Sequence, residues 1–458
     1  MKRRTFLKQL GIGAAGVGAW SDLTRIAAAA SLGSAAAIPN AAGEDYRALV
    51  CLFMFGGNDG NNTVIPTSAT EYQQYATGRT GALALAQGTL LPVSVQNTPG
   101  RTFALHPSMA GLQALFNQGK AAIVANAGPL LAPTTRASFQ ARSVPIPPDL
   151  YSHSDQQAQW QSSISDGSPR SGWGGRLGDL MKAANGASQS STLISVSGNN
   201  LFEVGTTLSS FKVSPGNHFG FDFYQGPTAT DPLSRAITSL LAMPGANLLE
   251  DAWKDVIARA MENQRVLASA LAAVPPFTTA FPNSGIGSQM QMVARLVAVR
   301  QALGLKRQVF FASLGGFDTH GDGQLGDQGQ LLGEVSAALS ALYSATVELG
   351  CADLVTSFTA SDFNRTFPSN GKGSDHAWGN HHFVVGGAVR GANMYGTFPT
   401  LVKGGPDDTG SGGLWIPSVA VDQYSATLAS WFGVNAADMG VIFPNLTRFA
   451  LPNLGFMA

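Results

Sequence analysis

The feature that most constrains the fold is a series of short, continuously apolar segments that alternate with helical patterns. The first segment, residues 47–55, has the length of a strand and no polar alternation, which is typical of a central strand covered on both faces. Similar segments lie at residues 121–125, 192–196, 308–314 and 353–358. Because strands that alternate with helices form parallel sheets, the sequence predicts an α/β fold with a doubly wound, mostly parallel sheet flanked by helices.

Helical patterns precede several of these segments, at residues 107–118, 173–184 and 331–349. In the last of them, apolar residues recur at three- and four-residue intervals: Leu332, Val335, Leu339 and Leu342. This spacing predicts one apolar stripe that covers the sheet.

The middle of the chain has a different composition. Residues 199–305 begin with a stretch rich in Gly, Ser, Thr and Pro and continue with two long helical patterns, at 249–273 and 287–303. We interpret this segment as an inserted, largely helical subdomain within one α/β domain that spans residues 43–458. The pattern of residues 418–432 predicts a helix that closes the domain near its C-terminus.

The N-terminus is interpreted as a twin-arginine signal peptide and linker, residues 1–42. Arg3 and Arg4 are followed by Phe6-Leu7-Lys8, a weakly apolar glycine-rich stretch and an alanine-rich run. This order predicts a periplasmic or secreted protein that meets the twin-arginine translocase during export; the alternative is a disordered basic tail. No later apolar run approaches the roughly 20 residues of a spanning helix, so we expect no integral membrane segment in the mature chain.

The charge and the cysteine content of the chain bear on its binding partners and on disulfide formation. The chain of 458 residues has 28 Lys and Arg and 28 Asp and Glu, so it has no basic excess of the kind that nucleic-acid binding requires. Its two cysteines, Cys51 and Cys351, permit a disulfide in an exported protein but equally suit two small core residues.

Four of the seven histidines fall between Phe317 and Phe383, beside aspartates that follow two predicted strands. The strongest candidates for metal ligands are Asp318, His320, Asp362 and His376. Carboxylates and imidazoles suit zinc, manganese or iron, and residues at strand ends meet at the carboxyl edge of a sheet. His381 is a further candidate, but it and the adjacent His382 should point in opposite directions, so at most one binds an ion.

Three further places offer reactive or ligating groups, each with a simpler alternative. Asn58 and Asp59 suit a metal carboxylate site or a turn in which they cap their own backbone. Ser152, His153 and Ser154 suit catalysis by a nucleophile at a helix N-terminus, or an ordinary N-cap. Arg365 could bind an oxyanion, or pair with Asp362 or Asp375 and hold the loop.

These motifs resemble those of the exported bacterial family known as domain of unknown function 1501. The resemblance rests on the leader, residues 55–62, 152–155, 315–320 and 361–366, and the Asp375-His376 segment. It implies the alkaline phosphatase/sulfatase superfamily, whose characterised members are two-metal hydrolases of phosphate and sulfate esters. It also implies one or two divalent ions, zinc first, with manganese, calcium or iron as other candidates.

Carried over by residue, the resemblance assigns Asp318 and His320 to one metal site and His376, or else His381, as the last metal histidine. Asp362 resembles the aspartate of an Asp-His motif, but Phe363 occupies the position of the histidine. The acidic residue of the first strand is shifted or replaced within Asn58-Asp59, and no serine matches the nucleophile.

Two functions follow from these patterns. The first is a periplasmic, metal-dependent hydrolase of phosphate or sulfate esters, acting on a small-molecule or polymer substrate. The second is a catalytically inactive exported binding or assembly protein on the same fold, which Phe363 and the unmatched nucleophile favour. The two differ in whether the acidic and imidazole side chains meet at one point.

Overall fold

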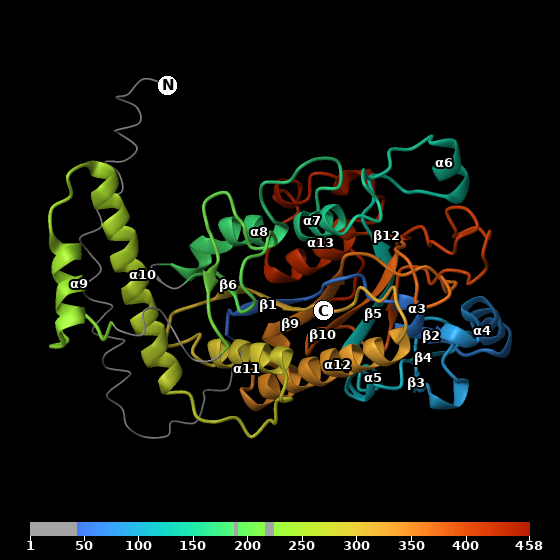
Figure 1. Ribbon diagram of the computed structural model, residues 1–458, viewed down its shortest axis with the longest axis horizontal. Helices are drawn as coiled ribbons and strands as arrows, with labels where there is room; N and C mark the ends of the chain where they lie inside the picture. The colour runs from blue at the N-terminus through green and yellow to red at the C-terminus, as the bar shows by residue number, and fades with distance from the viewer. Residues whose placement is uncertain (1–43, 187–190, 216–223) are drawn as a thin grey trace.

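The computed structural model describes residues 44–186, 191–215 and 224–458. The predicted twin-arginine leader therefore lies outside the described residues. Figure 1 shows a central sheet with helices on both of its faces. The elements of the main sheet are β1 (Arg47–Met54), β5 (Ala121–Gly128), β6 (Leu193–Ser195), β7 (Phe211–Lys212), β8 (Arg307–Leu314), β9 (Val355–Ser361), β10 (Asn380–Gly386), β11 (Met394–Tyr395) and β12 (Val419–Ala420).

The strand order of this sheet is β11-β5-β10-β9-β1-β8-β6-β7, and β12 also pairs with β5. β1 lies between β9 and β8 and is parallel to both, and the pairs from β8 to β6 and from β6 to β7 are parallel as well. β10 is antiparallel to both of its neighbours, β5 and β9. The mostly parallel α/β sheet predicted from the sequence is thus confirmed.

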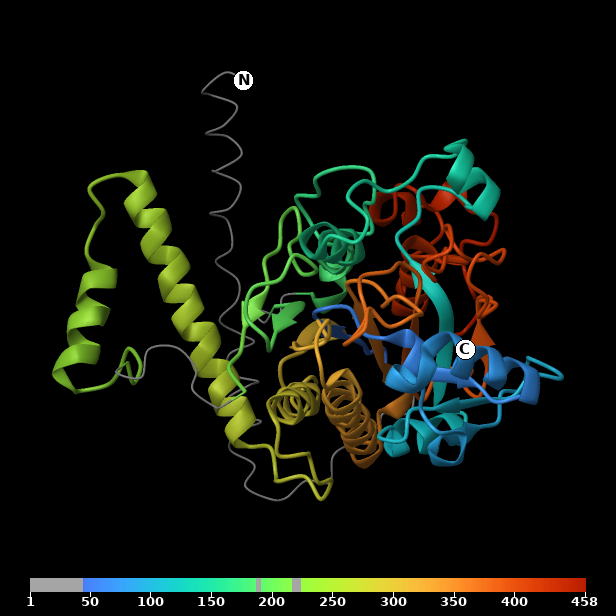
Figure 2. The same cartoon turned by 45° about the vertical axis from the view of Figure 1, so that its right-hand side comes forward.

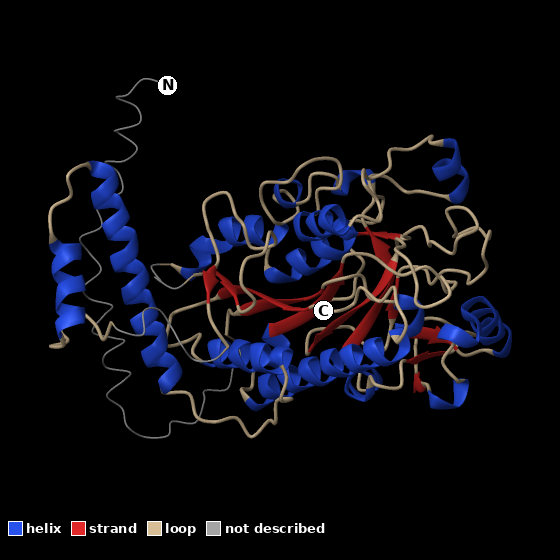
Figure 3. Cartoon of the chain, in the orientation of Figure 1, coloured by secondary structure: helices blue, strands red, loops and turns tan. Residues whose placement is uncertain are grey.

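The central strand is buried on both faces, as its continuous hydrophobicity predicts. Ala48, Val50, Leu52 and Met54 belong to one core cluster and the intervening Leu49, Cys51 and Phe53 to another, because successive side chains point to opposite faces of a strand. The first cluster packs against α5 (Ala110–Asn117), α11 (Gly285–Ala298) and α12 (Gln324–Glu348). The second packs against α7 (His153–Ser162), α8 (Trp173–Met181) and α13 (Val421–Phe432). Figure 3 shows both helical layers.

The two cysteines lie in different clusters. Cys51 belongs to the cluster under α8 and α13, whereas Cys351 belongs to the cluster under α11 and α12. Both thiols are free and buried. They serve as small core residues, the second of the two alternatives that the sequence left open.

A small antiparallel sheet and short helices complete the body around these layers. Their bounds are β2 (Val64–Pro66), β3 (Leu91–Val93), β4 (Phe103–Leu105), α3 (Gly60–Thr63), α4 (Ala69–Leu83), α6 (Arg136–Ala141), α14 (Met439–Ile442), η2 (Gln87–Thr89), η3 (Lys182–Asn185), η4 (Ala352–Leu354) and η5 (Leu446–Arg448). Within the described residues, no helix is both long and apolar enough to cross a membrane.

The segment 199–305, interpreted above as an inserted subdomain, contributes to the body and also projects from it. β7 joins the edge of the main sheet, and α11 packs in the same layer as α12. α9 (Pro232–Ala242) and α10 (Leu248–Ala272) form a helical hairpin that extends away from the body in Figures 1 and 2.

Candidate metal centre

Three loops and one helix meet at the carboxyl ends of the parallel strands β1, β8 and β9. Gly56 follows β1, Asp318 lies in the loop after β8, Asp362 directly follows β9, and His153 begins α7. The carboxyl ends of parallel strands lie at one edge of a sheet, so residues distant in sequence become neighbours there. The ends of these four elements form the candidate site.

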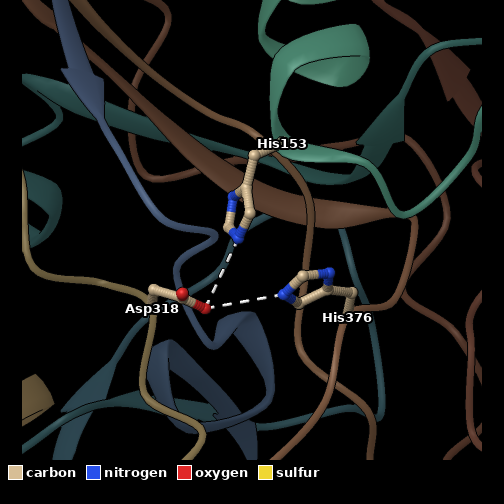
Figure 4. Close-up of side chains that lie close together, drawn as sticks. All are labelled: His153, Asp318 and His376. Carbon is tan, nitrogen blue, oxygen red and sulfur yellow. Dashed lines mark ion pairs between the residues drawn. The ribbon is translucent and has the colours of Figure 1, made fainter.

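His153, Asp318 and His376 each place one ligating atom within 4.8 Å of the others (Figure 4). The Nε2 atoms of His153 and His376 both lie 3.5 Å from Oδ1 of Asp318. In a tetrahedral zinc site with bonds of about 2.0–2.1 Å, two ligand atoms lie roughly 3.3 Å apart. The spacing of these three groups therefore fits a bound transition metal.

His320 lies beside this group, next to Asp318 and His376, but it is not one of the three residues whose ligating atoms all lie within 4.8 Å of one another. Its Nε2 lies 3.0 Å from Oδ1 of Asp318 and 2.7 Å from Nε2 of His376. β8 ends at Leu314, so Asp318 and His320 come together in a loop and not on a continued strand. The sequence prediction that these two side chains point to one place is nevertheless consistent with their 3.0 Å contact.

Each of the three histidines has an oxygen acceptor at its other ring nitrogen. Nδ1 of His153 lies 2.7 Å from Oδ2 of Asp362, and Nδ1 of His376 lies 2.7 Å from the carbonyl oxygen of Tyr151. Nδ1 of His320 lies 3.2 Å from Oδ1 of Asp375. An acceptor at Nδ1 holds the proton there and leaves a lone pair on Nε2, which is how histidine ligands are oriented in metal sites.

The Nε2 atoms of His153 and His376 therefore direct lone pairs toward one carboxylate oxygen. Nε2 of His320 lies 2.7 Å from Nε2 of His376, a distance at which a proton on one of the two nitrogens makes a hydrogen bond to the other. Two imidazoles and one carboxylate are a donor set that zinc, manganese or iron accepts.

The pKa of two members of the group favours the ligating forms. Burial lowers the pKa of His376, and the nearby Arg365 charge lowers it further. Burial acts to raise the pKa of Asp318, but the hydrogen bond from Arg365 and its charge outweigh that effect and lower it. His376 is therefore neutral and Asp318 ionised near neutral pH, as metal binding requires.

Arg365 acts on the group from behind and does not face solvent. Its side chain is fully buried, and Nη2 lies 2.6 Å from Oδ1 of Asp318. Nη2 also donates to the main-chain carbonyls of Gly56 and Phe317, while Nε donates to that of Gly57 and Nη1 to that of Ser374. Because these internal acceptors occupy the guanidinium, the geometry gives no place for the oxyanion that the sequence suggested for Arg365. It positions Asp318 and joins three loops.

Asp362, predicted as a ligand, lies one layer behind the ligating atoms. Its carboxylate is fully buried; Oδ2 contacts His153 and accepts from Nε2 of Gln157 at 2.8 Å. Oδ1 accepts from the backbone N–H of Gly56 at 3.2 Å. These three partners hold the carboxylate in place, so that it orients His153 and does not point toward Asp318 and His376.

Phe363 forms a wall beneath two of the imidazoles. Its ring centroid lies 4.8 Å from that of His153 and 4.4 Å from that of His376, and the side chain is fully buried. An aromatic ring offers no ligand at the position where the motif resemblance implies a histidine. The residues present therefore fit one ion at this point better than two.

Two backbone features allow this close assembly. Gly56 has φ of +115°, and a Cβ there would lie 2.4 Å from the backbone nitrogen of Asp318, so only glycine fits. Tyr151 has φ of +73°, which is costly for a residue with a side chain, and its carbonyl contacts His376. Such strained positions are concentrated at functional sites.

The structure does not bring Asn58, Asp59 or His381 to the group. Asp59 caps α3 and pairs with the buried Arg79, while Asn58 bonds to Thr63. These contacts are those of the turn that the sequence offered as the alternative. His381 is fully buried, stacks on Phe398, and accepts at Nδ1 from the backbone N–H of Asn126.

Burial lowers the pKa of His381 to about 3, so it stays neutral within the core. Its neighbour His382 lies on the opposite face, where its ring contacts Trp160 and Tyr424. The two rings point apart, as strand geometry predicts for adjacent residues. His376 is the last histidine that reaches the group.

The two candidate nucleophiles bond to an adjacent carboxylate. Ser152 is the N-cap residue of α7, and its hydroxyl lies 2.5 Å from Oδ2 of Asp155 and 3.2 Å from the hydroxyl of Ser154. Ser154 also contacts Oδ2 of Asp155, at 3.2 Å. These contacts hold the helix N-terminus, whereas His153 between the two serines turns into the site.

Sequence reasoning passed over two contributors to this arrangement, Gln157 and the carbonyl of Tyr151, and it considered Asp375 as a partner of Arg365, whereas Asp375 contacts His320. The sequence contained a signal for Gln157, since it follows His153 by one helical turn and both side chains reach Asp362. The Tyr151 carbonyl carries no sequence signal, because any residue has one.

A family model described as "Protein of unknown function (DUF1501)" matches residues 46–408. The chain belongs to the DUF1501 family. The match includes every residue of the candidate metal centre, from His153 to His376. No curated protein matches the chain.

Two solved structures are distantly similar to this DUF1501 protein. One is Ps i-CgsB in complex with k-i-k-neocarrahexaose, at 8% identity and a TM-score of 0.33, covering 89% of this chain and 77% of that one. The other is the PsFucS1 sulfatase from Pseudoalteromonas sp., at 11% identity and a TM-score of 0.36, covering 95% and 77%. Both likenesses are too weak to carry an argument about the site.

Proposed function

We propose that this protein is an exported, metal-dependent hydrolase that uses one divalent ion, with zinc as the first candidate, to cleave phosphate or sulfate esters. The observation that carries the proposal is the convergence of three Nε2 atoms on Asp318. Each of these imidazoles has an oxygen acceptor behind it at Nδ1. An unliganded surface cluster has no need for three imidazoles oriented in this way.

Bound to these donors, the ion would polarise an ester oxygen and lower the pKa of a water molecule. His153 and His376 would hold it through Nε2 and Asp318 through Oδ1, with His320 beside them. Arg365 would keep Asp318 ionised and in place. Asp362 and Asp375 would keep the protons on Nδ1 of their histidines.

A water molecule is the preferred nucleophile in this proposal. The hydroxyls of Ser152 and Ser154 both bond to Asp155, on the outward side of α7, and no donor of the group contacts them. Asp318 and His320 remain partly exposed, which leaves a coordination position open toward solvent. The ester class rests on the motif resemblance described above, and export rests on the predicted leader.

The alternative is an exported binding protein that retains the sheet without catalysis. Phe363 favours it, because a ring replaces a ligand under the two imidazoles. In this alternative the ion has a structural role, or the group binds none.

Elemental analysis combined with turnover assays tests the proposal. We expect the purified protein to contain about one equivalent of ion and to hydrolyse an aryl sulfate or an aryl phosphate, with both properties lost in Asp318→Ala. Asp322→Ala is the matched control, since Asp322 lies in the same loop, is 79% exposed and forms an ion pair with Lys372 on the surface. If the protein contains an ion but turns over neither ester with any of a panel of metals, the binding-protein alternative is supported. If the wild type contains no ion, both the metal-dependent hydrolase and the structural role of an ion are refuted.

A further inference from the structure

The α9–α10 hairpin presents apolar side chains to solvent. The C-terminal part of α10 joins the core through Leu267 and Leu271, but the turn between the helices lies far from the body in Figures 1 and 2. More than half of the large apolar side chains that are exposed in the described residues lie on this hairpin. They are Leu233, Leu240, Met243, Leu248, Leu249, Trp253 and Val256.

Five of these side chains form two stripes with heptad spacing. Leu233 and Leu240 are seven residues apart on α9, and Leu249, Trp253 and Val256 are spaced four and three residues apart on α10. Leu249 is 83% exposed and Trp253 61% exposed, so the stripes have no cover within the described chain. Such spacing is typical of helices that pack against other helices.

Both stripes lie on one face of the hairpin. Leu241 of α9 and Met261 of α10 line a pocket between the two helices, so each of them faces the other helix. An α-helix turns by about 100° per residue, so on each helix the stripe lies roughly a quarter turn away from the side that faces the other helix. Viewed from the N-terminus of each helix, this quarter turn has the same direction. Because the two helices run antiparallel, both stripes therefore lie on the same side of the hairpin. We call this surface the hairpin face.

Charges are kept away from the hairpin face. By the same rotation, Arg235, Asp251 and Asp255 lie on the opposite side, and exposed Ala236 and Ala260 lie next to the stripes. Lys254 is buried, and its ammonium reaches the carbonyl of Met243 and the carboxylates of Glu250 and Asp251. The other sides of the two helices thus carry charges of both signs, including the pair of Arg265 with Glu262, whereas helices that lie on anionic lipid have a basic polar side.

We propose that the hairpin face pairs with the same face of a second copy of this chain, so that two hairpins form a four-helix bundle. A charge-free apolar face two helices wide requires a partner surface of the same kind, and a two-fold contact supplies one. From the fractional exposures, the five side chains of the two stripes present an area on the order of 600 Å² per copy, at the lower end of the roughly 600–1,000 Å² that each partner contributes to an interface of standard size. The contact lies outside the metal centre and does not depend on it.

Sedimentation velocity of the full chain between 1 and 100 µM tests this pairing. We expect a dimer for the wild type and a monomer for Leu249→Glu and for Trp253→Glu, with at least a tenfold weaker association. Val347→Glu is the matched control, because Val347 is an exposed apolar residue on α12, far from the hairpin in sequence. Since all three positions are on the surface, we expect the same circular dichroism for every variant.

The remaining outcomes overturn the proposal. A wild-type chain that is monomeric at 100 µM shows that this face does not bind a second copy. In that case, flotation with phosphatidylcholine or phosphatidylglycerol vesicles that is lost in Leu249→Glu assigns the face to a lipid surface. A dimer that persists in both hairpin variants places the contact elsewhere on the molecule.

Discussion

Replacing the buried carboxylate behind His153 tests the metal centre most directly, through Asp362→Asn. Oδ1 of Asp362 accepts from Gly56, and Oδ2 receives both His153 and Gln157. An asparagine that keeps its oxygen toward Gly56 turns its NH2 group toward two donors. His153 can relieve this contact by moving its proton to Nε2, where it blocks the ion.

The size of the effect follows from this proton shift. A hydrogen bond to a charged group is worth about 1.5–3 kcal/mol, and about 1.4 kcal/mol corresponds to a tenfold change in affinity. We therefore expect the dissociation constant of the ion to rise by roughly 10- to 100-fold, the range found when partners of metal-binding histidines are removed. Competition with a chromophoric chelator at pH 7.5 measures it.

Asp375→Asn provides the graded comparison. Asp375 supports His320 from a position that is 57% exposed, so water can replace its contact. The value of such an exposed pair is about 0–1 kcal/mol, and we expect a change of no more than about fivefold. Asp322→Asn should leave the dissociation constant of the ion unchanged. If Asp362→Asn binds the ion as tightly as Asp322→Asn, Asp362 does not orient a ligand and the metal centre has been misassigned.

Three further predictions address the ligand set, the buried arginine and a buried acid. His376→Gln should lower the ion content measured by mass spectrometry, whereas His381→Gln should leave it unchanged; the opposite pattern would make His381 the ligand. Arg365→Met should lower the free energy of unfolding in urea by about 3–5 kcal/mol, because it leaves the partners of a buried charge unpaired. The control Arg101→Met removes a partly exposed ion pair and should cost less than about 1 kcal/mol. Equal losses in the two variants would contradict the buried role of Arg365. Burial raises the pKa of Glu203 to about 8 from 4.5, so between these pH values the folded chain keeps a proton that the unfolded chain releases. The protonated Glu203 therefore contributes fully to the free energy of unfolding below pH 4.5, and this contribution is lost as the pH rises toward 8. Glu203→Gln should remove this loss, so thermal midpoints of the wild type and variant should diverge between pH 5 and 9, and parallel curves would show that Glu203 is ionised throughout.

Much of the fold could be predicted from local patterns. The continuous hydrophobicity of residues 47–55 predicted a strand buried on both faces, and β1 alternates its side chains between two core clusters. The long helix before β9 was predicted from its apolar stripe, although it begins earlier, at Gln324, after Gly323 in a left-handed conformation. The antiparallel direction of β10 could not be predicted, because strand direction depends on the path of the connecting loops.

The candidate site was predicted in part. Asp318, His320 and His376 were recognised because acidic and imidazole side chains follow strands whose ends share one edge of a sheet. Asp362 and Arg365 were recognised as candidates, but the sequence could not predict that both are fully buried behind the other side chains of the group. Spacing along the chain does not distinguish a ligand from the residue behind it, since both have the same residue types at the same strand ends.

The sequence by itself determined the class of fold, the residue types available for chemistry and the segments that bring them to the sheet edge. The tertiary structure decided which of these side chains share a point: it turned His153 inward and His381 into the core, and it placed Asp362 behind a ligand. The physical reason is that hydrophobic periodicity is a local property of the chain. The direction of a side chain, by contrast, depends on loop geometry, on strained positions such as Gly56 and Tyr151, and on the buried partners that each polar group finds.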